Sequence, residues 1–303
     1  MSLPNIFRAA TLASLFSIAA SLANIAAAAD PGSIGFNFLK VSPGARNAAM
    51  GDVGTSISTN LYGVYFNPAA TAHNDVAVIG FMHHEGIFDT RREFIGGSGA
   101  VLGGVLTAGF DYFKFGSLEE RLGPTEEPIG LFDAQDMLAF AGYARQFSPK
   151  LSAGFSAKYA AEKIEARTAD AFLFDLGVQF APIEKATFGV AVRHIGSKPK
   201  FGDDEIELPL TFSAGAGVDV NNLIAAVEVS APKESDIRVN FGAEKLVAKM
   251  IAFRAGYKIG YDEEDFAAGV GFKKSIWEID YAFVPYKSGL GSAHRFALTV
   301  NLK

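Results

Sequence analysis

The chain of 303 residues contains no cysteine. Disulfide bonds and a lipid anchor on an amino-terminal cysteine are therefore both excluded. After residue 30 no apolar run approaches the roughly 18 residues that a membrane-spanning helix needs. The charged residues are 27 Lys and Arg against 33 Asp and Glu, and no basic cluster has the character of a nucleic-acid surface. We therefore expect no nucleic-acid partner.

The first 29 residues have the layout of a secretory signal peptide. Arg8 supplies a positive charge, residues 9–25 are mostly apolar, and Ala26 to Ala29 offer the small side chains that signal peptidase requires. We expect cleavage after Ala29. A retained membrane anchor is the alternative, because the apolar stretch is nearly long enough to span a bilayer. The alanine cluster favours cleavage, and hence export from the cytoplasm.

Apolar residues alternate with small or polar residues through almost all of the remaining chain. In residues 151–159, Phe155 shares one phase with other apolar side chains, and Ser156 belongs to the opposite phase. The same pattern returns in residues 210–218 and 277–283. A period of two is the side-chain period of a β-strand. The composition, with 27 Phe and 32 Gly, suits a sheet that meets lipid on one face and close packing on the other.

The pattern predicts about 14 strands, with boundaries good to a few residues. They are residues 75–84, 91–100, 103–116, 133–147, 151–164, 169–181, 186–195, 208–220, 223–230, 236–246, 250–260, 265–273, 276–285 and 292–302.

The connections between these strands decide the fold class. Short turns, such as Asn221-Asn222, alternate with longer loops, such as residues 117–132. This alternation is typical of a membrane-spanning barrel. We predict an all-β fold, a transmembrane antiparallel up-and-down β-barrel over residues 75–303, with an amino-terminal plug over residues 30–74. A soluble β-sandwich is the alternative, but it would not need such regular up-and-down connections.

If the apolar phase faces lipid, the charged side chains of the other phase point into the lumen. This inward set has equal numbers of both signs: Lys158, Arg193, Arg238, Arg254, Lys258, Lys273 and Arg295, with Glu162, Asp175, Asp219, Glu228, Glu244, Glu278 and Asp280. Opposite charges on neighbouring strands can pair, whereas an ion-selective pore would favour one sign. We select as a candidate lumen charge network Lys273, Glu278, Asp280, Arg295, Arg254, Glu228 and Asp219.

The inward phase also carries many glycines, and a glycine in a strand often marks the close approach of another backbone. They are Gly154, Gly177, Gly189, Gly215, Gly217, Gly242, Gly256, Gly269 and Gly271. We therefore expect the lumen to be filled.

Residues 30–74 are the expected filler. They are rich in small and apolar residues without alternation, and they are too apolar for a disordered tail, which is the alternative. Arg46 lies in this segment, whose one other lysine or arginine is Lys40. Inside a barrel its guanidinium must find carboxylates. The candidates, among which the sequence does not choose, are Glu278, Asp280, Glu228 and Asp219.

Several motifs span nearly the whole mature chain: Gly44-Ala45-Arg46, Met50-Gly51-Asp52-Val53-Gly54, Asn67-Pro68-Ala69 and residues 280–286. They resemble the PorV/PorQ group of outer-membrane proteins, within the wider FadL-type barrels. In FadL-type barrels the Asn-Pro-Ala stretch lies in the plug. The resemblance thus implies a plug motif of Arg46, Met50, Gly51, Asn67 and Pro68.

The same resemblance implies a non-enzymatic protein in the outer membrane of a diderm bacterium. PorV-like members assist type IX secretion by handing cargo proteins to the cell surface. The alternatives are FadL-like passive uptake of hydrophobic small molecules and a structural or adhesive role. The expected partners are outer-membrane lipid and lipopolysaccharide, together with secretion-system components, secreted cargo or hydrophobic small molecules.

We predict no catalytic site, no metal and no cofactor. His83 and His84, beside Glu85, are the nearest approach to a metal-binding set. Adjacent residues of a strand face opposite sides, so the two imidazoles cannot easily share one ligand sphere. No nucleophile elbow or zinc-ligand spacing is present.

Overall fold

The structure is a computed structural model, and it describes residues 34–41, 43–57, 60–74, 76–116, 118–124, 126–202, 204–233 and 235–302. The expected signal peptide, residues 1–29, lies outside these residues. Among the described helices, none has the length and apolar character needed to traverse a bilayer.

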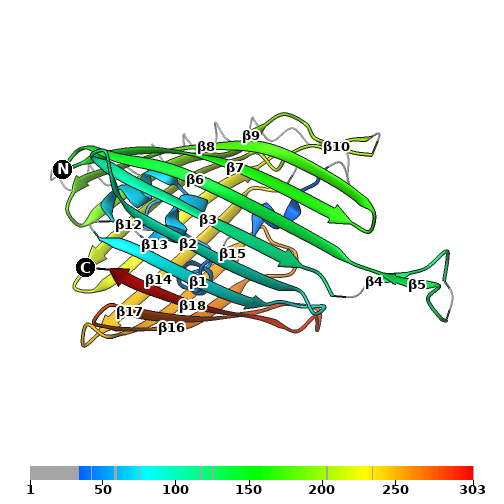
Figure 1. The fold of residues 1–303 in the computed structure, drawn as a ribbon. Coiled ribbons are helices and arrows are strands. Elements are labelled where there is room, and N and C mark those ends of the chain that lie inside the picture. The colour runs from blue at the N-terminus through cyan, green and yellow to red at the C-terminus, as the bar shows by residue number, and fades with distance from the viewer. Residues whose placement is uncertain are drawn as a thin grey trace, which may run out of the picture.

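In the described chain, fourteen strands form one closed antiparallel barrel (Figure 1). Successive barrel strands are neighbours, and β1 closes the barrel against β18. The barrel strands are β1 (Ala77–Glu85), β2 (Arg91–Val101), β3 (Gly104–Lys114), β6 (Ala134–Ser148), β7 (Leu151–Ile164), β8 (Arg167–Ile183), β9 (Ala186–Gly196), β12 (Thr211–Val220), β13 (Leu223–Pro232), β14 (Arg238–Val247), β15 (Ile251–Ile259), β16 (Phe266–Lys274), β17 (Trp277–Pro285) and β18 (Ser292–Leu302).

The predicted fold class is therefore confirmed, and each predicted strand has its counterpart in the barrel. Among the starts of the strands, the predicted and observed positions differ most for residues 208–220, where β12 begins only at Thr211. Pro209 has no N–H group to donate to a neighbouring strand. The backbone N–H of Leu210 instead donates to the carbonyl of Leu208 at 2.8 Å.

Two hairpins in the longer loops were not predicted. β4 (Leu118–Glu120) pairs with β5 (Gly130–Phe132), and β10 (Lys200–Phe201) pairs with β11 (Asp204–Glu205). These strands are too short to show a period of two in the sequence. The β4–β5 hairpin projects beyond the barrel at the end that carries the longer loops, which we call the long-loop end (Figure 1). The opposite end is the short-turn end.

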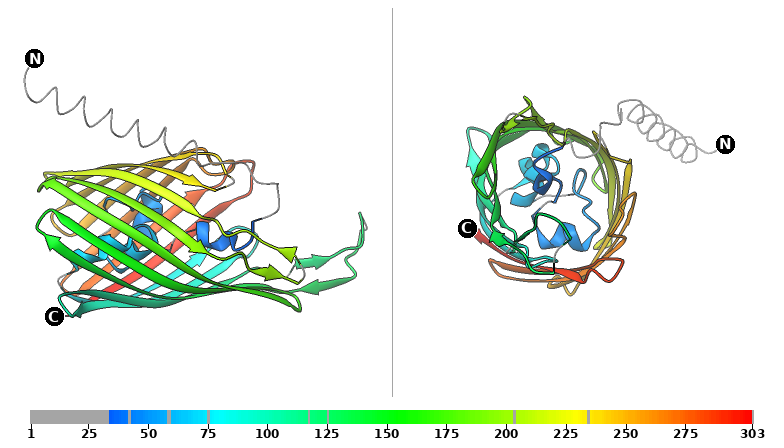
Figure 2. Two further views of the ribbon diagram at one scale, coloured as in Figure 1. Left: turned by 90° about the horizontal axis from the view of Figure 1, so that it is seen from above. Right: turned by 90° about the vertical axis from the view of Figure 1, so that its right-hand side faces the viewer.

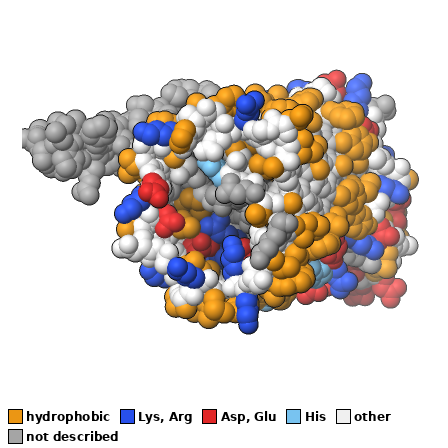
Figure 3. All heavy atoms as spheres, turned by 60° about the vertical axis from the view of Figure 1, so that its left-hand side comes forward, with side chains coloured by type: hydrophobic (Ala, Val, Ile, Leu, Met, Phe, Trp, Pro, Cys, Tyr) orange, Lys and Arg blue, Asp and Glu red, His pale blue; other side chains and the backbone are white. Residues whose placement is uncertain are grey.

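The two phases of the wall face different surroundings. In β7, Phe155 is 52% exposed, whereas the neighbouring Ser156 is fully buried. Apolar side chains cover much of the outer wall on the face that Figure 3 shows. Around the barrel, the exposed apolar side chains include Phe81, Ile95, Phe172, Leu176, Phe253, Val270 and Phe296. An outward apolar band combined with a polar interior is the pattern of a barrel that spans a membrane.

The segment from residue 34 to residue 74 lies inside this barrel (Figure 2). It contains four short helical elements: η1 (Asn37–Lys40), α2 (Ala45–Ala49), η2 (Leu61–Tyr65) and η3 (Pro68–His73). Most of its apolar side chains are fully or almost fully buried, and they form a core with inward residues of the wall such as Phe94, Phe140 and Leu173. We call residues 34–74 the plug.

The plug runs through the lumen from the long-loop end to the short-turn end. At the first, Gly35 donates its N–H to the carbonyl of Glu207, in the loop before β12. At the second, η3 leads into β1, which starts at the short-turn end. The plug thus reaches both openings of the barrel.

The inward glycines of the wall make room for the plug. A Cβ added at Gly256 would lie 2.0 Å from the backbone nitrogen of Gly51. One at Gly154 would lie 2.7 Å from the carbonyl carbon of Pro68. No side chain fits at such distances, so the predicted close approach of a second backbone is confirmed. Gly189 and Gly242 likewise meet the plug backbone, whereas Gly177, Gly215, Gly217 and Gly269 meet plug side chains. Gly271 has no plug neighbour, because the side chains of Arg254 and Asp280 in the wall lie beside it.

Candidate functional site: the plugged lumen

A cavity lies on each side of the plug. The cavity toward the long-loop end has a volume of about 250 Å³, and we call it the long-loop vestibule. The cavity toward the short-turn end has a volume of about 440 Å³, and we call it the short-turn vestibule. Charged side chains of both signs lie in the hollow at the short-turn end (Figure 3). A solute that crosses the barrel must therefore pass polar walls and displace or bypass the plug.

Arg46 holds the centre of the plug to the wall. Its Nε donates to Oε2 of Glu244 at 2.8 Å, and its Nη2 donates to Oε1 of the same carboxylate at 3.0 Å. Burial alone would lower the pKa of Arg46, but the carboxylate of Glu244 raises that pKa above its ordinary value. A two-pronged arginine–carboxylate contact fixes orientation as well as charge. Arg46 thus fixes the position of α2 in the lumen.

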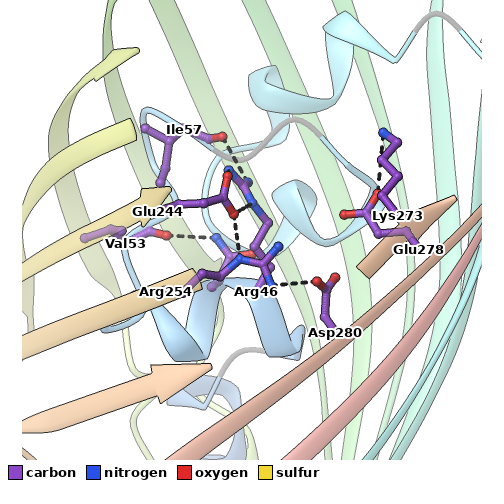
Figure 4. A network of polar contacts seen from close by, with 9 residues as sticks. Arg46, Val53, Ile57, Glu244, Arg254, Lys273, Glu278 and Asp280 are labelled. Atoms are coloured by element: carbon purple, nitrogen blue, oxygen red, sulfur yellow. Dashed lines mark hydrogen bonds and ion pairs between the residues drawn. The ribbon is translucent and has the colours of Figure 1, made fainter. Parts of the chain in front are cut away.

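The contact extends across two more strands (Figure 4). Nε of Arg254 donates to Oε2 of Glu244 at 2.5 Å, and its Nη1 donates to Oδ1 of Asp280 at 2.6 Å. Glu244 and Arg254 are direct cross-strand partners on β14 and β15. The result is an alternating row of charges, from Arg46 of the plug to Asp280 on β17, in which each charge faces an opposite one.

The predicted partners of Arg46 were therefore wrong, because its carboxylate is Glu244. Asp280 is one step further along the row. Glu228 accepts instead from the backbone N–H groups of Gly54 and Thr55, both at 2.8 Å. The partner of Arg46 depends on how deep the plug sits, and the wall pattern carries no information about that depth.

The other members of the predicted lumen charge network are spread over both openings. Lys273 and Glu278 form an ion pair at 3.7 Å in the short-turn vestibule. Arg295 lines the long-loop vestibule, where its Nη1 lies 3.7 Å from Oδ1 of Asp52. Asp219 was wrongly placed in this network, because it is exposed one residue before β12 ends. Asp219 belongs to the inward phase of the alternation, but it lies at the end of the strand, beyond the part of the lumen that the plug fills.

Asn67 and Pro68 combine a local and a long-range role. The side-chain oxygen of Asn67 accepts from the N–H of Ala69 at 3.0 Å and caps η3, with Pro68 at the favoured first position of the helix. Its amide nitrogen donates to Thr55 in the plug at 2.9 Å and to Val178 in the wall at 3.0 Å. Asn67 therefore ties together two parts of the plug and strand β8.

Met50 and Gly51 lie where the plug backbone meets β14 and β15. Met50 is fully buried, and Gly51 adopts a positive φ of 69° that favours glycine. The carbonyl of Gly51 accepts from the side-chain amide of Asn240 at 2.5 Å. All five predicted motif residues thus contact the lumen wall or hold the plug together.

Asp52 and Lys258 form an ion pair that the predicted lumen charge network did not include. Nζ of Lys258 lies 2.5 Å from Oδ2 of Asp52 and 2.5 Å from Oε2 of Glu264. Asp52 is the one acidic residue in the segment 34–57, and its place beside Gly51 was the available signal. An acid in an apolar segment needs a cation when the segment is buried.

His83 and His84 face opposite sides of β1, as predicted for adjacent residues of a strand. His84 is buried toward the lumen, whereas Nδ1 of the outward His83 lies 2.7 Å from a carboxylate oxygen of Glu93. In the described residues no group of three or more His, Asp or Glu side chains is arranged to hold a metal ion.

Together, the closed 14-strand wall and the threaded amino-terminal segment define a plugged β-barrel with the fold of FadL-type channels. The CymD monoaromatic hydrocarbon channel matches with a TM-score of 0.62 at 13% identity, over 88% of this chain and 99% of CymD. The toluene transporter TodX of Pseudomonas putida matches with a TM-score of 0.60 at 12% identity, over 86% and 97% of the two chains. A Pseudomonas aeruginosa FadL homologue matches with a TM-score of 0.57 at 10% identity, over 87% and 99%.

No protein-family model and no curated protein sequence matches this chain. At identities this low, the structural similarities establish the fold.

Proposed function

We propose that this protein is an outer-membrane channel for the passive uptake of small molecules, which the plug holds closed in the state described. One observation carries the proposal: the plug fills the lumen between the two vestibules and is held there by side-chain contacts. Such contacts can be broken and remade without covalent change. The printed names of CymD and TodX, which are hydrocarbon channels, support hydrophobic compounds as the first solute class to test.

The outer membrane of a diderm bacterium is the proposed location. The apolar outer wall requires lipid as its neighbour, and the signal-like amino terminus is suited to export. Lipid and lipopolysaccharide are accordingly the proposed partners of the wall. In this orientation the short-turn end faces the periplasm and the long-loop end faces the exterior.

The test is uptake by proteoliposomes that contain the purified full mature chain. We expect entry of toluene, or of another small solute, to be faster than in protein-free vesicles and to saturate only weakly, as for diffusion through a pore. A variant without residues 31–74 should admit solutes faster still, because the plug is gone. Entry equal to that of protein-free vesicles for both proteins would contradict the proposal.

Support of protein secretion, in the manner that the PorV/PorQ resemblance implies, is the second candidate function. The observation that favours it is the projecting β4–β5 hairpin, on which Leu122, Ile129 and Leu131 are exposed at the long-loop end. Exposed apolar side chains of this kind often mark protein contacts. Purification from detergent-solubilised outer membranes, with and without residues 118–132, separates the two functions. A secretion component that co-purifies with the intact protein, and is lost when residues 118–132 are deleted, supports a role in secretion. Absence of any such component from both preparations opposes that role.

A further inference from the structure

The two vestibules differ in charge. The short-turn vestibule is lined by three basic and three acidic residues: Arg46, Arg254, Lys273, Glu244, Glu278 and Asp280. The long-loop vestibule is lined by five basic residues against three acidic ones: Lys40, Arg193, Arg238, Lys258, Arg295, Asp52, Glu228 and Glu264. The cavity that opens toward the long loops is therefore the more positive of the two.

The excess charge is located on two arginines. Lys258 and Arg295 are both paired with Asp52, and Lys258 is also paired with Glu264. Neither Arg193 nor Arg238 forms an ion pair with a carboxylate anywhere in the described part of the chain. Neither guanidinium is therefore neutralised by direct contact with a carboxylate, although Glu228 in the same cavity attracts Arg193 from a longer distance.

The protein contacts of these two guanidinium groups are neutral. Arg193 donates from Nη1 to the carbonyl of Tyr65 at 3.0 Å and from Nη2 to the hydroxyl of Ser213 at 3.2 Å. Arg238 donates from Nη2 to the hydroxyl of Ser235 at 3.4 Å, and its guanidinium lies 4.5 Å from the ring centre of Tyr261. The Nε atoms of both arginines are buried and have no acceptor among the described residues.

Glu228 lines the same cavity but does not neutralise either arginine by direct contact. Its Oε2 accepts the N–H groups of Gly54 and Thr55 in the plug. A partly buried guanidinium without a counter-ion is costly, and its planar array of donors matches an oxyanion better than water does. The vestibule volume of about 250 Å³ far exceeds the ~10–15 Å³ that a single water needs, so a small anion fits.

The register of the wall brings hydroxyl groups between the two arginines. Ser213 on β12 pairs with Ser230 on β13, and Ser230 pairs with Arg238 on β14. Ser230 lines the vestibule. Because Arg193 reaches Ser213 from β9, this row runs from one guanidinium to the other across the sheet.

We propose that the long-loop vestibule is a binding site for a small hydrophilic oxyanion, a phosphate or carboxylate group, held between Arg193 and Arg238. The consequence for solute preference rests on the proposed function, because it requires that the protein is a channel. The binding site itself does not depend on that function, because binding can be measured on protein that transports nothing. It gives the channel a preference for solutes that carry an acid group.

Isothermal titration of the full mature protein in detergent micelles tests the site, with inorganic phosphate and acetate as separate probes. We expect saturable binding of at least one probe at low ionic strength, weakened by added salt because the contact is partly exposed to solvent. Arg193→Gln and Arg238→Gln should each weaken it roughly tenfold to a hundredfold, the effect expected for losing charged hydrogen bonds. Arg145→Gln, which removes an exposed arginine at the short-turn end of β6, should leave it unchanged.

Arg238→Gln is decisive if Arg193→Gln disturbs the plug, because the partners of Arg238, Ser235 and Tyr261, lie in loops of the wall and not in the plug. Absence of saturable binding of both probes would overturn the inference. So would binding that Arg238→Gln does not weaken. Phosphate binding without any solute entry into proteoliposomes would support the binding site and overturn the proposed function. Solute entry without saturable binding of either probe would support the proposed function and overturn the binding site.

Discussion

Deletion of residues 31–74 is expected to convert a nearly closed protein into an open pore in planar bilayers. Barrels of eight strands are filled by their own side chains, whereas those of 16 to 18 strands enclose an aqueous channel. A barrel of 14 strands lies nearer the second group, and here the plug occupies the space that would otherwise hold water. Single-channel conductance should therefore be low for the intact chain and clearly higher after the deletion.

A double variant keeps the plug and weakens its attachment. Arg46→Ala with Glu244→Gln removes the two-pronged contact at the centre of the lumen. We expect brief openings that the intact protein lacks, because the plug retains its contacts through Glu228 and Asn67. Arg145→Ala, on the outside of the wall, is the matched control and should behave like the intact protein. Conductance of the intact protein equal to that of an open porin would show that the lumen is not plugged.

An arginine on the outer face of the barrel is expected to destabilise the protein strongly. Val270 lies at the middle of β16 and is 45% exposed. Arginine at the bilayer midplane of such a wall costs roughly 2–4 kcal/mol. We expect Val270→Arg, and to a lesser degree Phe155→Arg nearer the strand end, to lower the free energy of unfolding by amounts in this range. Urea titration of protein in vesicles, followed by the fluorescence of the single Trp277, measures it.

The control for this series must come from the inward phase, but not from its packed part. Positions such as Gly256 meet the plug backbone, so substitution there is costly for a different reason. Asp219 follows the inward phase and is exposed at the short-turn end, so Asp219→Arg should change the free energy of unfolding by less than about 0.5 kcal/mol. Equal losses for Val270→Arg and Asp219→Arg would contradict the assignment of the outer face to lipid.

The wall of the barrel was predictable from the sequence because each strand carries its own signal. A period of two fixes which side chains face lipid, and short turns such as Asn221-Asn222 fix where strands end. The inward glycines also predicted a second backbone in the lumen, as Gly256 against Gly51 shows. These inferences depend only on neighbours along the chain or on the sheet.

The contacts of the plug were not predictable, because they depend on its depth and rotation in the lumen. The sequence offered Glu278, Asp280, Glu228 and Asp219 as equal candidates for Arg46, and only the depth of α2 in the lumen shows that the partner is Glu244. For the same reason, the selected charge network included the exposed Asp219 and omitted Glu244. The location of the excess positive charge on Arg193 and Arg238 likewise appears only when Asp52 of the plug is paired with Lys258 and Arg295 of the wall.

A disulfide cross-link between plug and wall tests the central claim most directly. An ideal Cβ at Gly217 lies 2.3 Å from Cγ2 of Ile57, close enough for two cysteines to reach the geometry of a disulfide. The natural chain has no cysteine, so Ile57→Cys with Gly217→Cys creates the only possible bond. The account predicts that cells exporting this variant yield oxidised protein, with no free thiol and faster migration of the unreduced, unfolded chain. Two thiols that remain free while the barrel is folded would contradict a plug seated in the lumen.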